Sequence, residues 1–445
     1  MKFVFLAVAV AAAPVLAGED LNLRIGTAKD LNLRVYGFVE TDVIADTTQG
    51  FSEAQGNSLV PPPNAAAGGP NFAGRRHRTE LSVRNSRLGF DFTAPESDSG
   101  LKTAAKIELD FLGNQGPNTA PGATPGAQSE AVYFDSPTAR VRHAYVDLAD
   151  AGWDVKIGQT WSLLGWQPIY FTGESAVMPT PGELYQRFPQ VRATRTLPLR
   201  GDWTIEAAAD AAKPAEMNSG SPDAHAGLRL ASTGIKAASL NGADTTMVGL
   251  SAAVSAALVP LATNGIGDPT GEIYAFDFAV PLIASRDGKE RAGNLLWIGE
   301  YMNGSGAGGL ELTGLSLGVP GIAAATPGAG SSIDPGIAGV NLSGNAELIR
   351  YQSLRSHLQY SPNDQWAFSA GYAQIEGLNL SHFARGTAAY AIAPKIQYGY
   401  VSAFYDALRW LRFGAELNQT RCTYNDPGSR FATNNRFQFS AYFIF

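Results

Sequence analysis

The sequence predicts an all-β fold, a 16-stranded antiparallel transmembrane β-barrel with an infolded third loop. Three observations support this class: strand-type segments recur along the chain, their connections are alternately long and short, and the last fifteen residues alternate in polarity. In that last segment Phe437, Phe439 and Phe443 share one strand face. Arg436 and Gln438 share the other. Aromatic side chains outside and polar side chains inside suit a closed sheet between lipid and water, because only closure satisfies every backbone group within a membrane.

The N-terminus predicts export. Met1 and Lys2 precede an apolar run that ends in small residues, so residues 1–17 are expected to be a signal peptide. This run is too short for a membrane-spanning helix, and no later stretch approaches the roughly 18 continuous apolar residues that such a helix needs. We expect residues 18–30 to be a short N-terminal segment and residues 31–445 to be the β-barrel domain.

Composition agrees with one large barrel. Apolar residues make up 45 % of the chain, with 49 glycines and 26 prolines for many turns. A chain of 445 residues would ordinarily suggest several soluble domains, but no linker or composition break divides it. Cys422 is the only cysteine, which excludes an internal disulfide and a cysteine-based metal cluster.

The connections between strand-type segments alternate in length. Eight long ones, rich in Gly, Pro, Asn and Ser, are expected at 46–77, 113–137, 160–186, 212–224, 258–271, 303–346, 377–391 and 422–430. Seven short ones are expected at 94–100, 149–152, 198–202, 239–244, 285–290, 361–364 and near 406. Short periplasmic turns and long external loops are typical of outer-membrane barrels. Sixteen strands would leave a water-filled lumen rather than a packed core.

Period-two alternation assigns side chains to the two faces of a strand. In the segment 101–111, Ile107 and Phe111 point one way, whereas Lys106, Glu108 and Asp110 point the other. The charged set is expected to face the lumen.

The third long connection is apolar and aromatic, unlike the Gly-rich loops. Its aromatic residues, among them Trp161, Trp166 and Tyr170, need burial, so we expect the segment to fold into the lumen and narrow it. Its acids Glu174 and Glu183 would then line the constriction. Alternatively, it packs across the barrel mouth or under a neighbouring subunit. The sequence leaves open whether the Gly-rich sixth connection lids the pore.

A basic cluster is expected opposite this loop. Arg140 and Arg142 share a strand face and would meet Arg87, Lys156 and Arg192 from neighbouring strands. Crowded cations in a pore raise the local concentration of anions even when the whole molecule is acidic, and this chain has a formal net charge of −7. Alternatively, each arginine forms an ion pair with a lumenal acid such as Glu40, Glu108 or Asp110.

Enzyme interpretations find little support. The five histidines form no HExxH motif and no metal-ligand spacing. We therefore expect no enzyme, no cofactor and no nucleic-acid partner. Two other classes stay open: a plugged barrel with a structural or adhesive role, and an outer-membrane phospholipase that uses His143 with a distant serine and asparagine.

Several segments resemble the DcaP-like family of trimeric porins. They are VYGFVETDV at 35–43, SRLGFDF at 86–92, RVRHAYVDL at 140–148 and IGQTWSLLGW at 157–166. The similarity covers most of the first two hundred residues and the C-terminal strand, whose final Phe resembles the assembly signature of outer-membrane barrels. It is weak through 210–390, and the coiled-coil segment of some members is missing.

The resemblance implies a homotrimer in the outer membrane of a Gram-negative bacterium. It implies passive uptake of small hydrophilic solutes, favouring anions such as dicarboxylates. Arg87, Arg142 and Arg192 match the basic wall residues of such porins, and Glu174 and Glu183 match the acidic loop. Besides the lipid bilayer, lipopolysaccharide is an expected partner, because the basic segment 75–78 is expected in an external loop, where it would bind lipid phosphates; alternatively, this segment is simply solvated.

Overall fold

The computed structural model describes residues 31–48, 77–113, 137–166, 180–214, 219–261, 268–285, 290–306, 338–384, 394–423 and 431–445. The predicted signal peptide and N-terminal segment lie outside these residues. Within the described ranges, no helix is long and apolar enough to cross a membrane.

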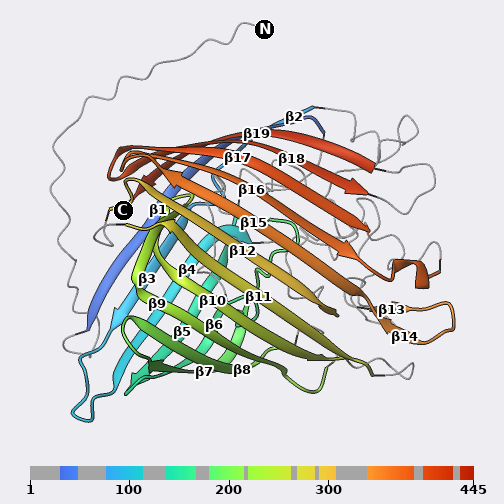
Figure 1. The fold of residues 1–445 in the computed structure, drawn as a ribbon, viewed down its shortest axis with the longest axis horizontal. Helices are drawn as coiled ribbons and strands as arrows, with labels where there is room; N and C mark the ends of the chain where they lie inside the picture. The colour runs from blue at the N-terminus through green and yellow to red at the C-terminus, as the bar shows by residue number, and fades with distance from the viewer. Residues whose placement is uncertain are drawn as a thin grey trace, which may run out of the picture.

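Antiparallel strands form a closed sheet (Figure 1). The elements are β1 (Asn32–Asp46), β2 (Arg78–Ser82), β3 (Arg87–Thr93), β4 (Lys102–Gly113), β5 (Thr138–Asp150), β6 (Trp153–Trp161), β7 (Arg187–Pro198), β8 (Trp203–Ala212), β9 (Asp223–Asn241), β10 (Asp244–Pro260), β11 (Thr270–Ile283), β12 (Asn294–Ser305), β13 (Ala338–Val340), β14 (Ala346–Leu348), β15 (Arg350–Ser361), β16 (Trp366–Gly377), the 3₁₀ helix η4 (Leu380–His382), β17 (Lys395–Leu408), β18 (Leu411–Thr423) and β19 (Phe431–Ile444). Pairing of β1 with β19 closes the barrel.

The described chain contains sixteen strand positions around the barrel. β2 pairs with the C-terminal part of β1 and β3 with its N-terminal part, so these two short strands share one position. β13 and β14 form a separate two-stranded sheet. The predicted sixteen-stranded barrel is confirmed, and its long and short connections fall where the sequence predicts them.

Side chains divide an apolar exterior from a polar interior. On β19, Phe437 and Phe443 are 45 % and 52 % exposed, whereas Arg436 is 1 % exposed. β4 follows the predicted faces too, with Ile107 42 % exposed and Glu108 5 % exposed. A closed antiparallel barrel with this division is a transmembrane barrel of the outer-membrane type.

The third connection, between β6 and β7, folds into the barrel as predicted. Leu164 and Leu184 are almost completely buried against an apolar patch on the inner surface. This patch, here the apolar wall, comprises Ala257, Val259, Ile273, Ala275, Met302, Tyr351, Ile375, Ile396, Cys422 and Ala432 of β10–β12 and β15–β19. The Gly165 amide donates to Ser255 Oγ at 3.0 Å, which fixes the connection to β10.

Two external segments cover the same wall. Ile349, Leu380 and Phe383 belong to the apolar cluster and are at most 3 % exposed. Glu347 Oε1 lies 2.6 Å from His382 Nδ1, which joins the β13–β14 hairpin to η4. Residues 307–337 of the sixth connection lie outside the described residues, so its predicted role as a lid stays a prediction.

The link between β9 and β10 differs from a plain turn. Pairing of β9 with β8 stops at Ser232, and pairing of β10 with β11 begins at Ser251. Residues 236–249 pair with each other across a two-residue turn and are not part of the barrel sheet. We call them the crossing hairpin. A register shift between Gly249 and Ser251 marks where the chain leaves the barrel.

The crossing hairpin runs into the lumen. Leu240 packs with Phe38 of β1 and Tyr442 of β19, on the other side of the barrel from β9 and β10 (Figure 1). The predicted short link at 239–244 is therefore confirmed as a tight turn, but this turn lies inside the barrel rather than at its rim.

Candidate functional site

A cavity of ≈ 490 Å³ lies between the third connection and the inner faces of β4 to β9. We call it the charged passage. Its walls are formed by Lys106, His143, Tyr145, Asp154, Lys156, Thr160, Trp161, Leu163, Trp166, Arg192, Thr194, Thr196, Glu206 and Arg229. Four of these residues are cations and two are carboxylates, so the lining has a formal excess of two positive charges.

Each cation of the charged passage is held by an acid. The pairs are Lys106–Asp91 at 2.9 Å, Lys156–Asp147 at 3.0 Å, Lys156–Asp154 at 2.6 Å, Arg192–Asp210 at 3.4 Å, and Arg229–Glu206. Three of the acids, Asp91, Asp147 and Asp210, are not among the lining residues. In the pair of Arg192 and Asp210 the cation is the more exposed partner, because 13 % of the Arg192 side chain and 0 % of the Asp210 side chain are exposed.

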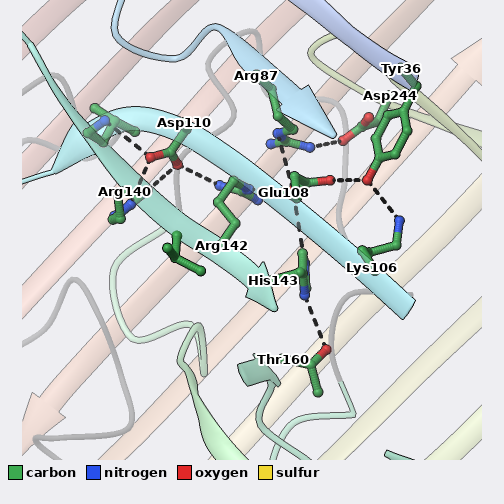
Figure 2. Close-up of polar contacts among 12 residues, drawn as sticks. Tyr36, Arg87, Lys106, Glu108, Asp110, Arg140, Arg142, His143, Thr160 and Asp244 are labelled. Atoms are coloured by element: carbon green, nitrogen blue, oxygen red, sulfur yellow. Dashed lines mark hydrogen bonds and ion pairs between the residues drawn. The ribbon is translucent and has the colours of Figure 1, made fainter. Parts of the chain in front are cut away.

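The charged passage adjoins a buried network of arginines and acids on β3, β4 and β5 (Figure 2). Arg142 bridges the two acids of β4, with Nε 2.7 Å from Glu108 Oε1 and Nη1 3.0 Å from Asp110 Oδ2. Arg140 contacts the same Asp110 at 2.5 Å. Arg87 Nε lies 3.6 Å from Glu108 Oε1. We call these five residues the arginine cluster. Since every arginine in it meets a carboxylate, the geometry matches the interpretation of paired charges rather than of a free basic ladder.

A β-bulge explains how β5 contributes two adjacent residues to the interior. Glu108 lies opposite His143 and Leu109 opposite Val141, so Arg142 is an extra residue in the pairing. Arg142 and His143 are both buried as a result. His143 Nδ1 lies 3.2 Å from Thr160 Oγ1 and its Nε2 lies 4.0 Å from Glu108 (Figure 2). The described residues around His143 thus offer a threonine and an acid instead of the serine of the phospholipase hypothesis.

Aromatic rings of the third connection lie against the arginines. The Arg187 guanidinium is 4.4 Å from the Trp161 ring centroid and 5.3 Å from that of Tyr185. Burial would raise the pKa of Tyr185, but Arg142 and Arg187 hold this pKa below its ordinary value. The field around this phenol is therefore strongly positive.

Glu183 contacts the other side of the barrel. It is 2 % exposed, and Oε1 lies 2.8 Å from Arg355 Nη1 on β15. Glu300 of β12 lies 3.7 Å from the same arginine and accepts the Leu184 amide at 3.2 Å. Burial raises the pKa of Glu183 to about 7, with Glu300 adding to the rise and Arg355 opposing it. Glu183 therefore fixes the third connection to β15 and does not face the predicted arginines.

The structure separates the predicted site residues into groups. Arg87, Arg140 and Arg142 lie in the arginine cluster, and Lys156 and Arg192 line the charged passage opposite each other on β6 and β7. Tyr170 and Glu174 lie outside the described residues.

Sequence reasoning missed several charged groups of the lumen. Arg229 lines the charged passage, with its guanidinium 5.2 Å from the Trp166 ring centroid. Arg355 holds Glu183, and Asp244 holds Arg87 at 2.8 Å. Period-two alternation along β9 and β15 could have placed Arg229 and Arg355 inside, but no local signal placed Asp244 there.

Comparisons with known proteins agree on the fold. No protein-family model matches the chain, and no curated protein matches it. The outer-membrane channel DcaP of Acinetobacter baumannii superposes with a TM-score of 0.63 at 16 % identity, covering 94 % of this chain and 99 % of that one. OmpF of Salmonella typhi, in a complex with daunomycin, gives 0.47 at 13 % identity, with 93 % and 97 % covered. The trimer form of OmpT from Vibrio cholerae gives 0.46 at 14 %, with 94 % and 100 % covered.

The DcaP superposition is the one on which the fold comparison rests. It spans nearly the whole of both chains, so the likeness includes the complete barrel rather than a shared hairpin. The chain has the fold of an outer-membrane channel.

Proposed function

We propose that the protein is a passive diffusion channel of the Gram-negative outer membrane, which passes small hydrophilic solutes and favours anions such as dicarboxylates. The observation that carries this proposal is the charged passage, a polar cavity inside a barrel whose exterior is apolar. Its four cations and two acids favour negatively charged solutes.

The mechanism is selection by size and fixed charge. The third connection narrows the lumen, and Lys156 and Arg192, neighbours on β6 and β7, attract the solute. The acids behind them weaken this attraction, so that binding stays weak enough for the solute to leave. We further propose a homotrimer, in which each barrel carries its own passage.

Single-channel recording under a salt gradient tests the proposal. We expect stepwise conductance in multiples of three with an anion-selective reversal potential, and a block of chloride current by succinate. Arg192→Gln should lower the anion preference about twofold, the factor that one unit charge at roughly 8 Å gives in water. Folded barrel that conducts no ions would contradict the proposal.

Arg195→Gln is the matched control. Arg195 lies on the same strand, but it shares the outer face with Val191 and Leu197, which are 53 % and 43 % exposed. Its guanidinium lies 5.3 Å from the Trp153 ring centroid. The same charge change on this face should leave selectivity unaltered.

A second candidate is a plugged barrel with a structural or adhesive role. It is favoured by the apolar wall, which is covered by the third connection and by Ile349, Leu380 and Phe383. Conductance separates the two functions, because a plugged barrel would fold normally and pass no current.

A further inference from the structure

The crossing hairpin is hydrogen-bonded to β15 of the barrel. Gln359 of β15 is 2 % exposed and makes two hydrogen bonds to the backbone of Leu240. Its Nε2 donates to the Leu240 carbonyl at 2.9 Å, and its Oε1 accepts the Leu240 amide at 2.7 Å. Gln359 pairs with both backbone groups of Leu240, as a neighbouring strand would do, and so fixes the position of this residue.

The turn of the hairpin is capped by a buried arginine. Arg412 of β18 donates through Nη1 to the carbonyl oxygens of Gly242 at 2.9 Å and Ala243 at 3.1 Å. Its Nη2 donates to Thr245 Oγ1 at 3.0 Å, and its Nε contacts Asp406 at 2.5 Å. These bonds satisfy carbonyl groups that the turn would otherwise leave without a partner inside the barrel.

The hairpin carries a carboxylate to the arginine cluster. Asp244 follows the turn, and its side chain is 50 % exposed although it lies 2.8 Å from Arg87. Arg87 contacts Glu108, which accepts a hydrogen bond from Tyr36, and Lys106 of the charged passage donates to the same phenol at 2.8 Å (Figure 2). Asp244 is therefore linked to the passage by a short chain of polar contacts.

We propose that the crossing hairpin forms a second constriction between the charged passage and the end of the barrel with short connections, and that Asp244 is a specificity-determining residue there. This inference rests on the proposed channel function. A half-exposed carboxylate beyond the cations repels an anion that the cations have attracted. Asp244 therefore shortens the time an anion spends in the charged passage and limits the anion preference of the whole channel.

Replacement of the carboxylate tests the role of its charge. Asp244→Asn should raise the anion-to-cation permeability ratio about twofold, the factor expected for one unit charge at roughly 8 Å in water. The matched control is Asp150→Asn, since Asp150 is an exposed acid next to the short link between β5 and β6. This control should leave the ratio unchanged.

Thiol modification tests the position of the residue. Asp244→Cys should lose conductance when it is treated with a membrane-impermeant anionic methanethiosulfonate. This loss should be faster when the reagent is added on the side of the short connections than on the other side. The native Cys422 is 0 % exposed, so the unmodified parent protein serves as the control. The inference alone would be overturned if the parent channel conducts, Asp244→Asn leaves the permeability ratio unchanged and Asp244→Cys does not respond to the reagent. Folded parent protein without any current would overturn the channel function and the inference with it.

Discussion

The two halves of the lumen obey the same strand alternation but carry different chemistry. The inner faces of β3 to β9 present ion pairs such as Arg142 with Glu108 and Lys156 with Asp154. The inner faces of β10–β12 and β15–β19 present the apolar wall, for example Ile273, beside buried charged side chains such as Glu300 and Arg355. The ion pairs of the first half attract water and solutes, whereas the apolar wall of the second half is covered favourably by apolar side chains.

The third connection has a different face for each half. Leu164 and Leu184 pack on the apolar wall, whereas Trp161, Leu163 and Trp166 line the charged passage. This difference shows where the open part of the lumen lies. The third connection attaches where it can bury its leucines, so the space that remains is on the charged side.

The largest expected effect is the loss of an arginine from the charged half. Arg142→Met should leave Glu108 and Asp110 without their shared partner, and we expect a loss of about 3–5 kcal/mol in the free energy of unfolding. The reversal potential should also shift toward cations. Unfolding in urea, followed by the gel mobility of the folded barrel, measures the first effect.

Arg140→Met is the comparison for that variant. The Arg140 side chain is 31 % exposed and that of Arg142 is 4 % exposed, so the loss of Arg140 should cost about 1 kcal/mol or less. Equal losses in the free energy of unfolding for the two variants would mean that burial does not determine how much each arginine of the cluster contributes to stability.

A smaller effect is expected from the apolar half. Leu184→Ala removes a side chain that is 1 % exposed and should weaken docking of the third connection by about 2 kcal/mol. Channel currents should become larger and noisier, because the loop then leaves the wall part of the time. Leu228→Ala is the control, since Leu228 is 50 % exposed on the outer face of β9 and should leave the current unchanged.

Much of this comparison could be predicted from sequence. Alternation in 101–111 placed Glu108 and Asp110 inside, and the aromatic content of the third connection predicted its infolding. These predictions succeed because a lipid exterior and a polar interior impose one pattern on every strand.

The missed features depend on tertiary contacts. A bulge at Arg142 turns His143 inward, against the strict alternation of β5. The segment around Gly242 correctly reads as a tight turn, but its direction depends on Gln359 and Arg412, more than a hundred residues away. Turn residues fix the local geometry of a hairpin and not the side of the sheet toward which it folds.

A pH-dependent effect concerns the ionised state of Glu183, which joins the third connection to β15. The pKa of Glu183 is about 7 against an ordinary value of 4.5, so the folded chain binds a proton that the unfolded chain loses between these values. Stability from this group is therefore complete below about pH 4.5 and declines as the pH rises to 7. Above pH 7 Glu183 is ionised at a buried position next to Glu300, which disfavours its charge, so we expect noisier currents with a midpoint near pH 7.

Glu183→Gln should abolish this pH dependence, because the amide resembles the protonated carboxyl, and near pH 4, below both pKa values, its free energy of unfolding should differ from that of the parent by less than about 1 kcal/mol. Glu347→Gln is the control: hydrogen bonds from Asn341, His382 and Asn379 outweigh partial burial and hold the pKa of Glu347 below its ordinary value. Glu347 therefore stays ionised from pH 5 to 9, and its variant should keep the midpoint. A midpoint near 7 that persists in Glu183→Gln would mean that the titrating group lies elsewhere and that ionisation of Glu183 does not control how the loop is held.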